Sequence, residues 1–332
     1  MRSDIRSSRS ATVKFLAMGL IWGASFLFIK IALEGVTFGQ VAWSRIVLGA
    51  TVLAIVFIAS RGRVPREPIM WVHFLVLAVA NCVLPYLMFA WAEQYVSSSL
   101  ASIYNAVTPL TTALLATLAF RVDRLRWLQV VGLLVGALGV LVIVAPWKPD
   151  SLVGTLPGQL ACLGAVTLYG IAYGYTRRFV TPRGLPGLTL ATFNIGVAAV
   201  IMLVLTPWVA WAPVELDWRI VGSLVLLGAL GTGFAYIWHF DVLRDWGATR
   251  ASTVTYVTPV VGVVLGVSIL GETLSWNEPV GALVIFAGIL LTQQRFAFGR
   301  RASVVDAVVP EAVVEDALVQ PENDARRDAA DH

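Results

Sequence analysis

The sequence predicts an all-α integral membrane protein whose ten transmembrane helices form two inverted five-helix repeats, with both termini in the cytoplasm. Three observations favour this fold. First, 58% of the 332 residues are hydrophobic and only 13% are charged, whereas roughly 25% of the residues of a soluble domain are charged. Second, long apolar segments follow one another with short polar breaks between them. Third, motifs of the first half of the chain recur in the second half.

The apolar segments have the length that a bilayer requires. A spanning helix needs about 20 mostly apolar residues. The ten predicted spans are residues 12–33, 38–60, 70–92, 98–120, 127–145, 156–176, 188–209, 220–240, 248–270 and 277–294. The first span follows basic residues, as a signal peptide does, but it is too long for the apolar core of one and contains Lys30. We therefore predict that it is a retained helix.

The basic residues predict the orientation of these spans. Ten alternating spans place 20 of the 24 Lys and Arg residues on the side that holds both termini. Only Lys148 and Arg219 fall on the opposite side, while Lys30 and Arg45 lie within spans. Because short cytoplasmic loops carry an excess of Lys and Arg, both termini are predicted to be cytoplasmic.

An internal repeat divides the chain. Tyr86 aligns with Tyr236, and the Thr-Pro pair that ends at Pro109 aligns with the pair that ends at Pro259. Because five is an odd number of helices, the second copy enters the membrane from the opposite side, as in many secondary transporters. The predicted parts are a cytoplasmic segment 1–11, a first repeat 12–145, a second repeat 156–294 and an acidic, disordered cytoplasmic tail 295–332.

The repeated motifs resemble a known family. The chain is similar to the EamA-type drug/metabolite transporter superfamily, duplicated in one chain, from about residue 13 to residue 293. The matching motifs are Trp22-Gly23 through Lys30, Arg45, Thr108-Pro109, Thr258-Pro259 and Gly271-Glu272-Thr273-Leu274. The first copy departs from the pattern, with Arg121-Val122-Asp123 where the family often has Gly-Glu.

The resemblance implies a ten-helix exporter of small metabolites in the plasma membrane of a bacterium. Within the superfamily, the chain is most similar to amino-acid exporters, including the aromatic amino-acid exporters of the YddG type. We expect a monomer whose partners are a small-molecule substrate and the lipid bilayer, with no nucleic acid.

Aromatic residues within the spans predict a binding cavity. A membrane-interface belt places Trp and Tyr at the ends of spans, but six of these residues lie inside spans: Trp22, Tyr86, Tyr169, Tyr173, Tyr236 and Tyr256. A cavity lined by rings with a few polar tips suits amphipathic metabolites. Ordinary packing is the alternative for any single tyrosine.

Two basic residues within spans are further candidates for the cavity. Arg45 lies deep enough in the second span to need a partner, either a substrate carboxylate or the carbonyl groups of a helix end. Lys30 lies near a helix end, where its long side chain can also reach the interface.

Prolines and amides mark the middle of three spans. Proline lacks the N–H that would bond to the carbonyl four residues earlier, so Pro85 and Pro109 free the carbonyls of Asn81 and Asn105. Pro259 does the same in the second repeat. Broken helices at mid-membrane bind substrates in many transporters, so the two asparagines are predicted to line the cavity and the three prolines to act as hinges or gates. Simple kinks that shape packing are the alternative.

Motifs that are absent from the sequence argue against several classes of membrane protein. No phosphate-binding loop is present, so this chain does not pump with ATP. No predicted span has an interior Asp or Glu, which favours facilitated diffusion or exchange over a proton-coupled antiporter. A polytopic membrane enzyme would need a cluster of metal ligands or a nucleophile. A channel would need rings of charged side chains or of carbonyl groups. The sequence predicts none of these features, and it predicts no cofactor.

Overall fold

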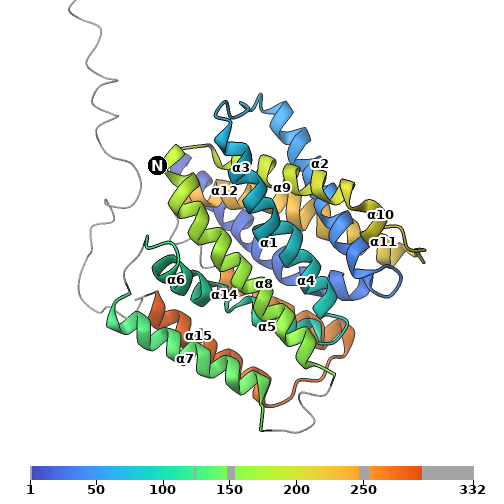
Figure 1. The fold of residues 1–332 in the computed structure, drawn as a ribbon, viewed down its shortest axis with the longest axis vertical. Helices are drawn as coiled ribbons and strands as arrows, with labels where there is room; N and C mark the ends of the chain where they lie inside the picture. The colour runs from blue at the N-terminus through green and yellow to red at the C-terminus, as the bar shows by residue number, and fades with distance from the viewer. Residues whose placement is uncertain (1, 123–124, 148–153, 247–253, 294–332) are drawn as a thin grey trace, which may run out of the picture. The chain divides into compact units, whose positions relative to one another are not determined.

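The computed structural model describes residues 2–122, 125–147, 154–246 and 254–293, and every regular element in them is helical. The first half contains α1 (Arg2–Ala32), α2 (Phe38–Ala59), α3 (Ile69–Leu77), the π-helix η1 (Ala78–Val83), α4 (Leu84–Ala92), α5 (Ser98–Asn105), α6 (Thr108–Leu118) and α7 (Trp127–Val144). The second half contains α8 (Leu156–Tyr175), η3 (Thr176–Val180), η4 (Thr181–Arg183), α9 (Gly187–Val204), α10 (Thr206–Val209), α11 (Trp218–Val225), the π-helix η5 (Leu226–Phe234), α12 (Ala235–Trp246), α14 (Val254–Leu270) and α15 (Asn277–Thr292). Figure 1 shows these elements.

Polar side chains start several of the helices. Thr37 accepts a hydrogen bond from the N–H of Gln40 at 3.3 Å, and the Gln40 side chain accepts one from the N–H of Thr37 at 2.8 Å. This capping box satisfies N–H groups that the first turn of α2 leaves unpaired. Ser97 caps α5 and Asp217 caps α11 by a single bond each, accepted from the N–H of Leu100 and of Ile220.

The two halves of the chain pack against each other helix by helix. In the first half, α1 packs on α14 and α2 packs on η5. The corresponding elements of the second half make the corresponding contacts, because α8 packs on α6 and α9 packs on η1. Each of these four contacts therefore joins a helix of the first half to a helix of the second half.

The closest packing joins α7 and α15, which run side by side (Figure 1). Three glycines of α7, Gly132, Gly136 and Gly139, lie in this contact. A Cβ on Gly288 would lie 2.6 Å from the carbonyl oxygen of Gly132. The two backbones thus meet where neither helix carries a side chain.

The predicted spans correspond closely to helices. Seven described helical segments are long and apolar enough to cross a membrane, whereas α14 and α15 are apolar but shorter. The remaining predicted span, 98–120, is two helices, because α5 ends at Asn105 and α6 begins at Thr108. The count of ten spans, the inverted arrangement and the side of the membrane that holds each end stay predictions. The acidic tail 295–332, Lys148 and Asp123 lie outside the described residues.

Candidate functional site

Arg45, on α2, is the centre of the candidate site. Its guanidinium carbon lies 3.9 Å from the centroid of the Tyr86 ring, a cation–π contact. Its Nε donates a hydrogen bond to Thr232 Oγ1 at 3.2 Å. Within the described part of the chain no carboxylate forms an ion pair with Arg45. This hydrogen bond uses Nε and not the two terminal amino groups, which are the groups that form parallel hydrogen bonds to a carboxylate.

Three more of the six predicted aromatic residues lie near Tyr86. Tyr169 and Tyr173, on α8, and Tyr236, on α12, lie within electrostatic range of Tyr86 and of one another. Tyr86 is buried, whereas Tyr173 is 49% exposed. The phenol groups therefore extend from the protein interior to an accessible surface.

Trp22 joins this cluster from α1. Its indole N–H donates to the carbonyl oxygen of Gly231 at 2.9 Å. Its ring meets the edge of the Tyr236 ring, with 6.2 Å between centroids, and also contacts His239 at 5.7 Å. The half-buried indole thus has a hydrogen-bond partner within η5 and ring contacts with the cluster.

Two π-helices support the site at equivalent places in the two halves. η1 precedes Tyr86 and η5 precedes Tyr236. A π turn leaves backbone groups without the usual α-helical partner and is often found at functional sites. In η5 the backbone carbonyl of Gly231 accepts from Trp22 of α1, and the side-chain hydroxyl of Thr232 accepts from Arg45 of α2.

The predicted asparagines lie at the interruptions of their helices. Asn81 is within η1, and Asn105 is the last residue of α5. The carbonyl of Asn105, which Pro109 frees, accepts a hydrogen bond from the Thr108 hydroxyl at 2.8 Å. The carbonyl that Pro109 leaves without an α-helical partner is therefore satisfied by a local hydrogen bond.

Lys30 and Tyr256 have partners elsewhere. The Lys30 ammonium donates to the carbonyl oxygens of Glu93 at 2.5 Å and Val96 at 3.0 Å, just beyond the end of α4. The Tyr256 hydroxyl donates to the side-chain oxygen of Gln293, and its ring lies 6.0 Å from that of Phe286 on α15. The structure thus places these two predicted cavity residues in contacts with helix ends and with α15.

The prolines differ in their effect on the helices. Pro85 lies in the first turn of α4, directly after η1, and Pro109 lies in the first turn of α6, directly after the interruption. Pro259, by contrast, lies inside α14, which continues through it. The Thr258 hydroxyl donates to the carbonyl of Val254 at 3.1 Å there. The helix break predicted at Pro259 is therefore not seen, because a helix can accommodate one proline as a kink.

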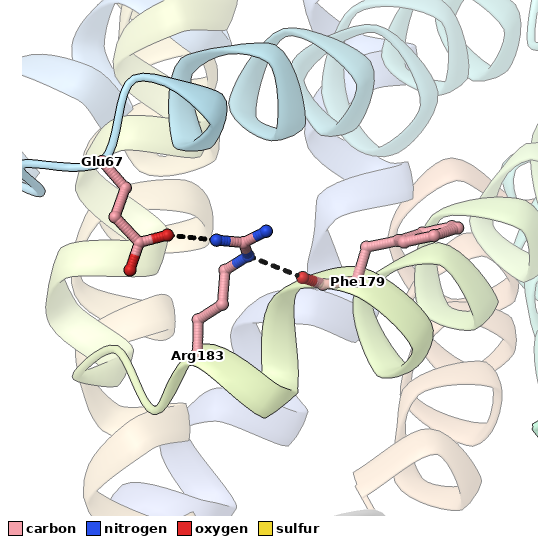
Figure 2. Close-up of polar contacts among 3 residues, drawn as sticks. All are labelled: Glu67, Phe179 and Arg183. Carbon is pink, nitrogen blue, oxygen red and sulfur yellow. Dashed lines mark hydrogen bonds and ion pairs between the residues drawn. The ribbon is translucent and has the colours of Figure 1, made fainter.

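Near the start of α3, an ion pair joins the two halves. Figure 2 shows the Arg183 guanidinium against the Glu67 carboxylate and against the carbonyl oxygen of Phe179. His73 stacks on the Phe179 ring, with 6.1 Å between centroids, and its Nδ1 lies 2.8 Å from the Tyr175 hydroxyl. This histidine is therefore part of a packed contact between α3 and η3.

Comparison with known families decides what kind of protein carries this site. The model of the EamA-like transporter family matches residues 10–145 and again residues 156–293. The chain belongs to the EamA-like transporter family. It is thus a multi-pass membrane transporter, which acts in a lipid bilayer on small molecules.

Relatives of this EamA protein align along nearly their whole length. The uncharacterized inner membrane transporter YedA of Escherichia coli is 28% identical over 314 residues, which cover 90% of this chain and 95% of YedA. The uncharacterized transporter YoaV of Bacillus subtilis is 23% identical over 287 residues, with 86% and 97% coverage. A crystal structure with 20% sequence identity and a TM-score of 0.59 covers 86% of this chain and 97% of its own, and shows the fold.

The structure also shows polar residues of the EamA protein that the sequence reading missed. Thr232 is buried and bonded to Arg45. Glu93 directly follows α4 and is buried, although its position just beyond a predicted span suggested a loop. Within the described residues, no group of three or more His, Cys, Asp and Glu is placed to hold a metal ion.

Glu272, in the family motif after α14, has a structural role. Its carboxylate accepts hydrogen bonds from the N–H of Ser98 at 2.7 Å, the N–H of Ser99 at 2.9 Å and the Ser99 hydroxyl at 2.6 Å. Burial raises the pKa of Glu272, but these hydrogen bonds outweigh burial and hold its pKa below the usual value. Glu272 is therefore an ionised cap on the start of α5.

Proposed function

We propose that this EamA transporter exports small amphipathic metabolites, above all amino acids with aromatic or other neutral side chains. The observation that carries the proposal is the position of Arg45. Its guanidinium contacts Tyr86 of the first half and Thr232 of the second half, and the hydrogen bond to Thr232 uses Nε, not the terminal amino groups. A cation beside phenol and indole rings matches a ligand with a carboxylate at one end and an apolar or aromatic group at the other.

Alternating access between two inverted five-helix halves is the proposed mechanism. The equivalent contacts of α1 with α14 and of α8 with α6 support a two-fold relation between the halves. The site takes Trp22, Arg45 and Tyr86 from the first half and Tyr169, Tyr173 and Tyr236 from the second half. A movement of one half against the other would therefore open and close the site, as in other transporters built from inverted repeats.

Substitution of Arg45 tests the proposed substrate class. We expect Arg45→Gln to slow exchange of a labelled neutral amino acid across proteoliposomes by about tenfold or more, because a charge-assisted hydrogen bond contributes about 1.5–3 kcal/mol. The assay is counterflow of a panel of amino acids and of the matching decarboxylated amines, with an ionophore present so that no proton gradient contributes. Facilitated diffusion or exchange predicts that counterflow persists under this condition.

Two controls sharpen the experiment. Arg63→Gln, in an exposed connection between α2 and α3, should leave counterflow unchanged. Arg45→Lys keeps the charge but loses the planar fork, so it should retain only part of the activity. Equal transport of the amines and the amino acids, or full activity of Arg45→Gln, would show that the substrate is not recognised through a carboxylate.

The predicted orientation is tested by cysteine labelling in intact cells. Cysteines at Gln94 and Pro213 are expected to react with an impermeant thiol reagent added outside, whereas cysteines at Arg63 and Pro182 should not. All four positions are exposed, so side chains there tolerate substitution. Gly35 is unsuitable for this experiment because a Cβ on it would lie 2.0 Å from the carbonyl oxygen of Glu215. Reaction at the second pair and not at the first would reverse the topology.

A further inference from the structure

Glu93 is a buried carboxylate without a hydrogen-bond partner. Its side chain is 0% exposed, and neither carboxylate oxygen has a partner among the described residues. Its neighbours in the chain, Ala92 and Val96, belong to the large apolar cluster between α4, α5 and α8. An ionised carboxylate in such surroundings costs several kcal/mol unless it is paired, so such a group neutralises itself by binding a proton.

Charged and titratable groups from four elements face Glu93. Lys30 of α1 and Arg45 of α2 favour its ionised form, whereas Glu272, after α14, opposes it. Cys162 of α8 also lies within electrostatic range of Glu93. Lys30 gives its hydrogen bonds to the carbonyl oxygens of Glu93 and Val96, so its ammonium is held at the helix end and does not bond to the Glu93 carboxylate.

We propose that Glu93 is a proton-binding site, and that its proton stabilises the packing of α1 against the end of α4, which closes this face of the transporter. The positive-inside rule predicts that this is the outer face. Opening the face requires α1 to separate from the end of α4, which brings water to Glu93. Water solvates the carboxylate, so the proton is released to the side on which the face opens.

The direction of the pH effect follows from the two environments. In the closed packing, burial raises the pKa of Glu93 well above its usual value, and the attraction of Lys30 only partly offsets burial. In the open state we expect a pKa near the ordinary value of about 4.3. Below both values Glu93 is protonated in both states, and pH does not favour either. Between them, each rise of one pH unit shifts the equilibrium towards the open state by at most about tenfold.

Because the proton enters and leaves on one face, the site regulates transport without driving it. This distinguishes Glu93 from the carboxylates of proton-coupled carriers, which must be reached from both sides. The inference relies on the proposed function only for its transport assay, since proton binding can be measured without a substrate.

Infrared spectroscopy tests proton binding directly. Reconstituted protein with isotope-labelled glutamate is titrated from acid to alkaline pH, and the carbonyl stretch of protonated carboxyl groups is followed. We expect a protonated glutamate band that persists well above the pH at which ordinary carboxylates ionise, and that is absent from Glu93→Gln. Glu34→Gln is the matched control, because Glu34 is exposed at the end of α1 and should leave the band unchanged. If all glutamates of the wild type ionise at their ordinary pH, the proposal is wrong, whether or not Glu93→Gln folds.

Transport supplies the second measurement. Counterflow of a neutral amino acid, with the same pH on both sides, is expected to accelerate with rising pH in the wild type. Glu93→Gln resembles the protonated residue, so its rate should be low and independent of pH. Identical pH profiles of wild type and Glu93→Gln would overturn the proposed gate. A persistent infrared band together with no amino-acid transport would leave the proton site in place and refute the proposed substrate.

Discussion

Valine at Gly288 is expected to lower the stability of the protein by about 3 kcal/mol, the upper part of the range for overpacked cores. A Cβ at this position would lie 2.6 Å from the carbonyl oxygen of Gly132 and 2.6 Å from the backbone N of Gly136. Both contacts are backbone atoms of α7, which cannot rotate away as a flexible side chain can. The helices would have to separate along the face formed by Gly132, Gly136 and Gly139, with loss of the dispersion contacts that hold apolar helices together in lipid.

The measurement is thermal unfolding in detergent, where we expect the midpoint to fall by roughly 5 °C or more. Gly196→Val is the matched control. Gly196 also lies within an apolar helix, α9, but a Cβ there would meet no atom within 4 Å. A similar loss of stability in both variants would mean that a general effect of valine in these helices, and not the contact of α7 with α15, determines the result.

Much of this fold is predictable because a bilayer imposes a length and a composition on each helix. The segments that become α2, α3 to α4 and α9 were recognised from apolar length alone, and Pro109 identified the interruption between α5 and α6. The π turns η1 and η5 were not predicted, because no residue type marks them. Pro259 shows the same limit, since its surroundings in α14 decide whether a proline breaks the helix or only bends it.

The candidate site was partly predictable for a related reason. Polar and aromatic residues inside an apolar span must have a partner, so Trp22, Arg45 and Tyr236 could be selected from the sequence. Thr232 was missed because a threonine within a span is usually satisfied by its own helix. Glu93 was missed because it lies one residue beyond α4, where a carboxylate normally reaches water. Only the packing of α1 and α8 around that helix end shows that it is buried.

The difference between Pro109 and Pro259 leads to the second large expected effect. Pro109→Ala restores an N–H four residues after Asn105, so α5 and α6 can join into one straight helix. We expect slower counterflow and a shift of about 1–3 kcal/mol towards one facing state. Accessibility of a single cysteine at Ser98, which is buried at the start of α5, reports that shift, because a thiol reagent reaches it only when this face opens. Pro259→Ala should change the facing equilibrium less, because α14 is already continuous there.

Equal effects of the two substitutions would show that both prolines act as hinges during transport. Unchanged transport in both variants would show that the prolines serve only helix packing. A strong effect of Pro109→Ala alone would locate the hinge at the junction of α5 and α6, where the Thr108 hydroxyl already bonds to the Asn105 carbonyl that the proline leaves unpaired.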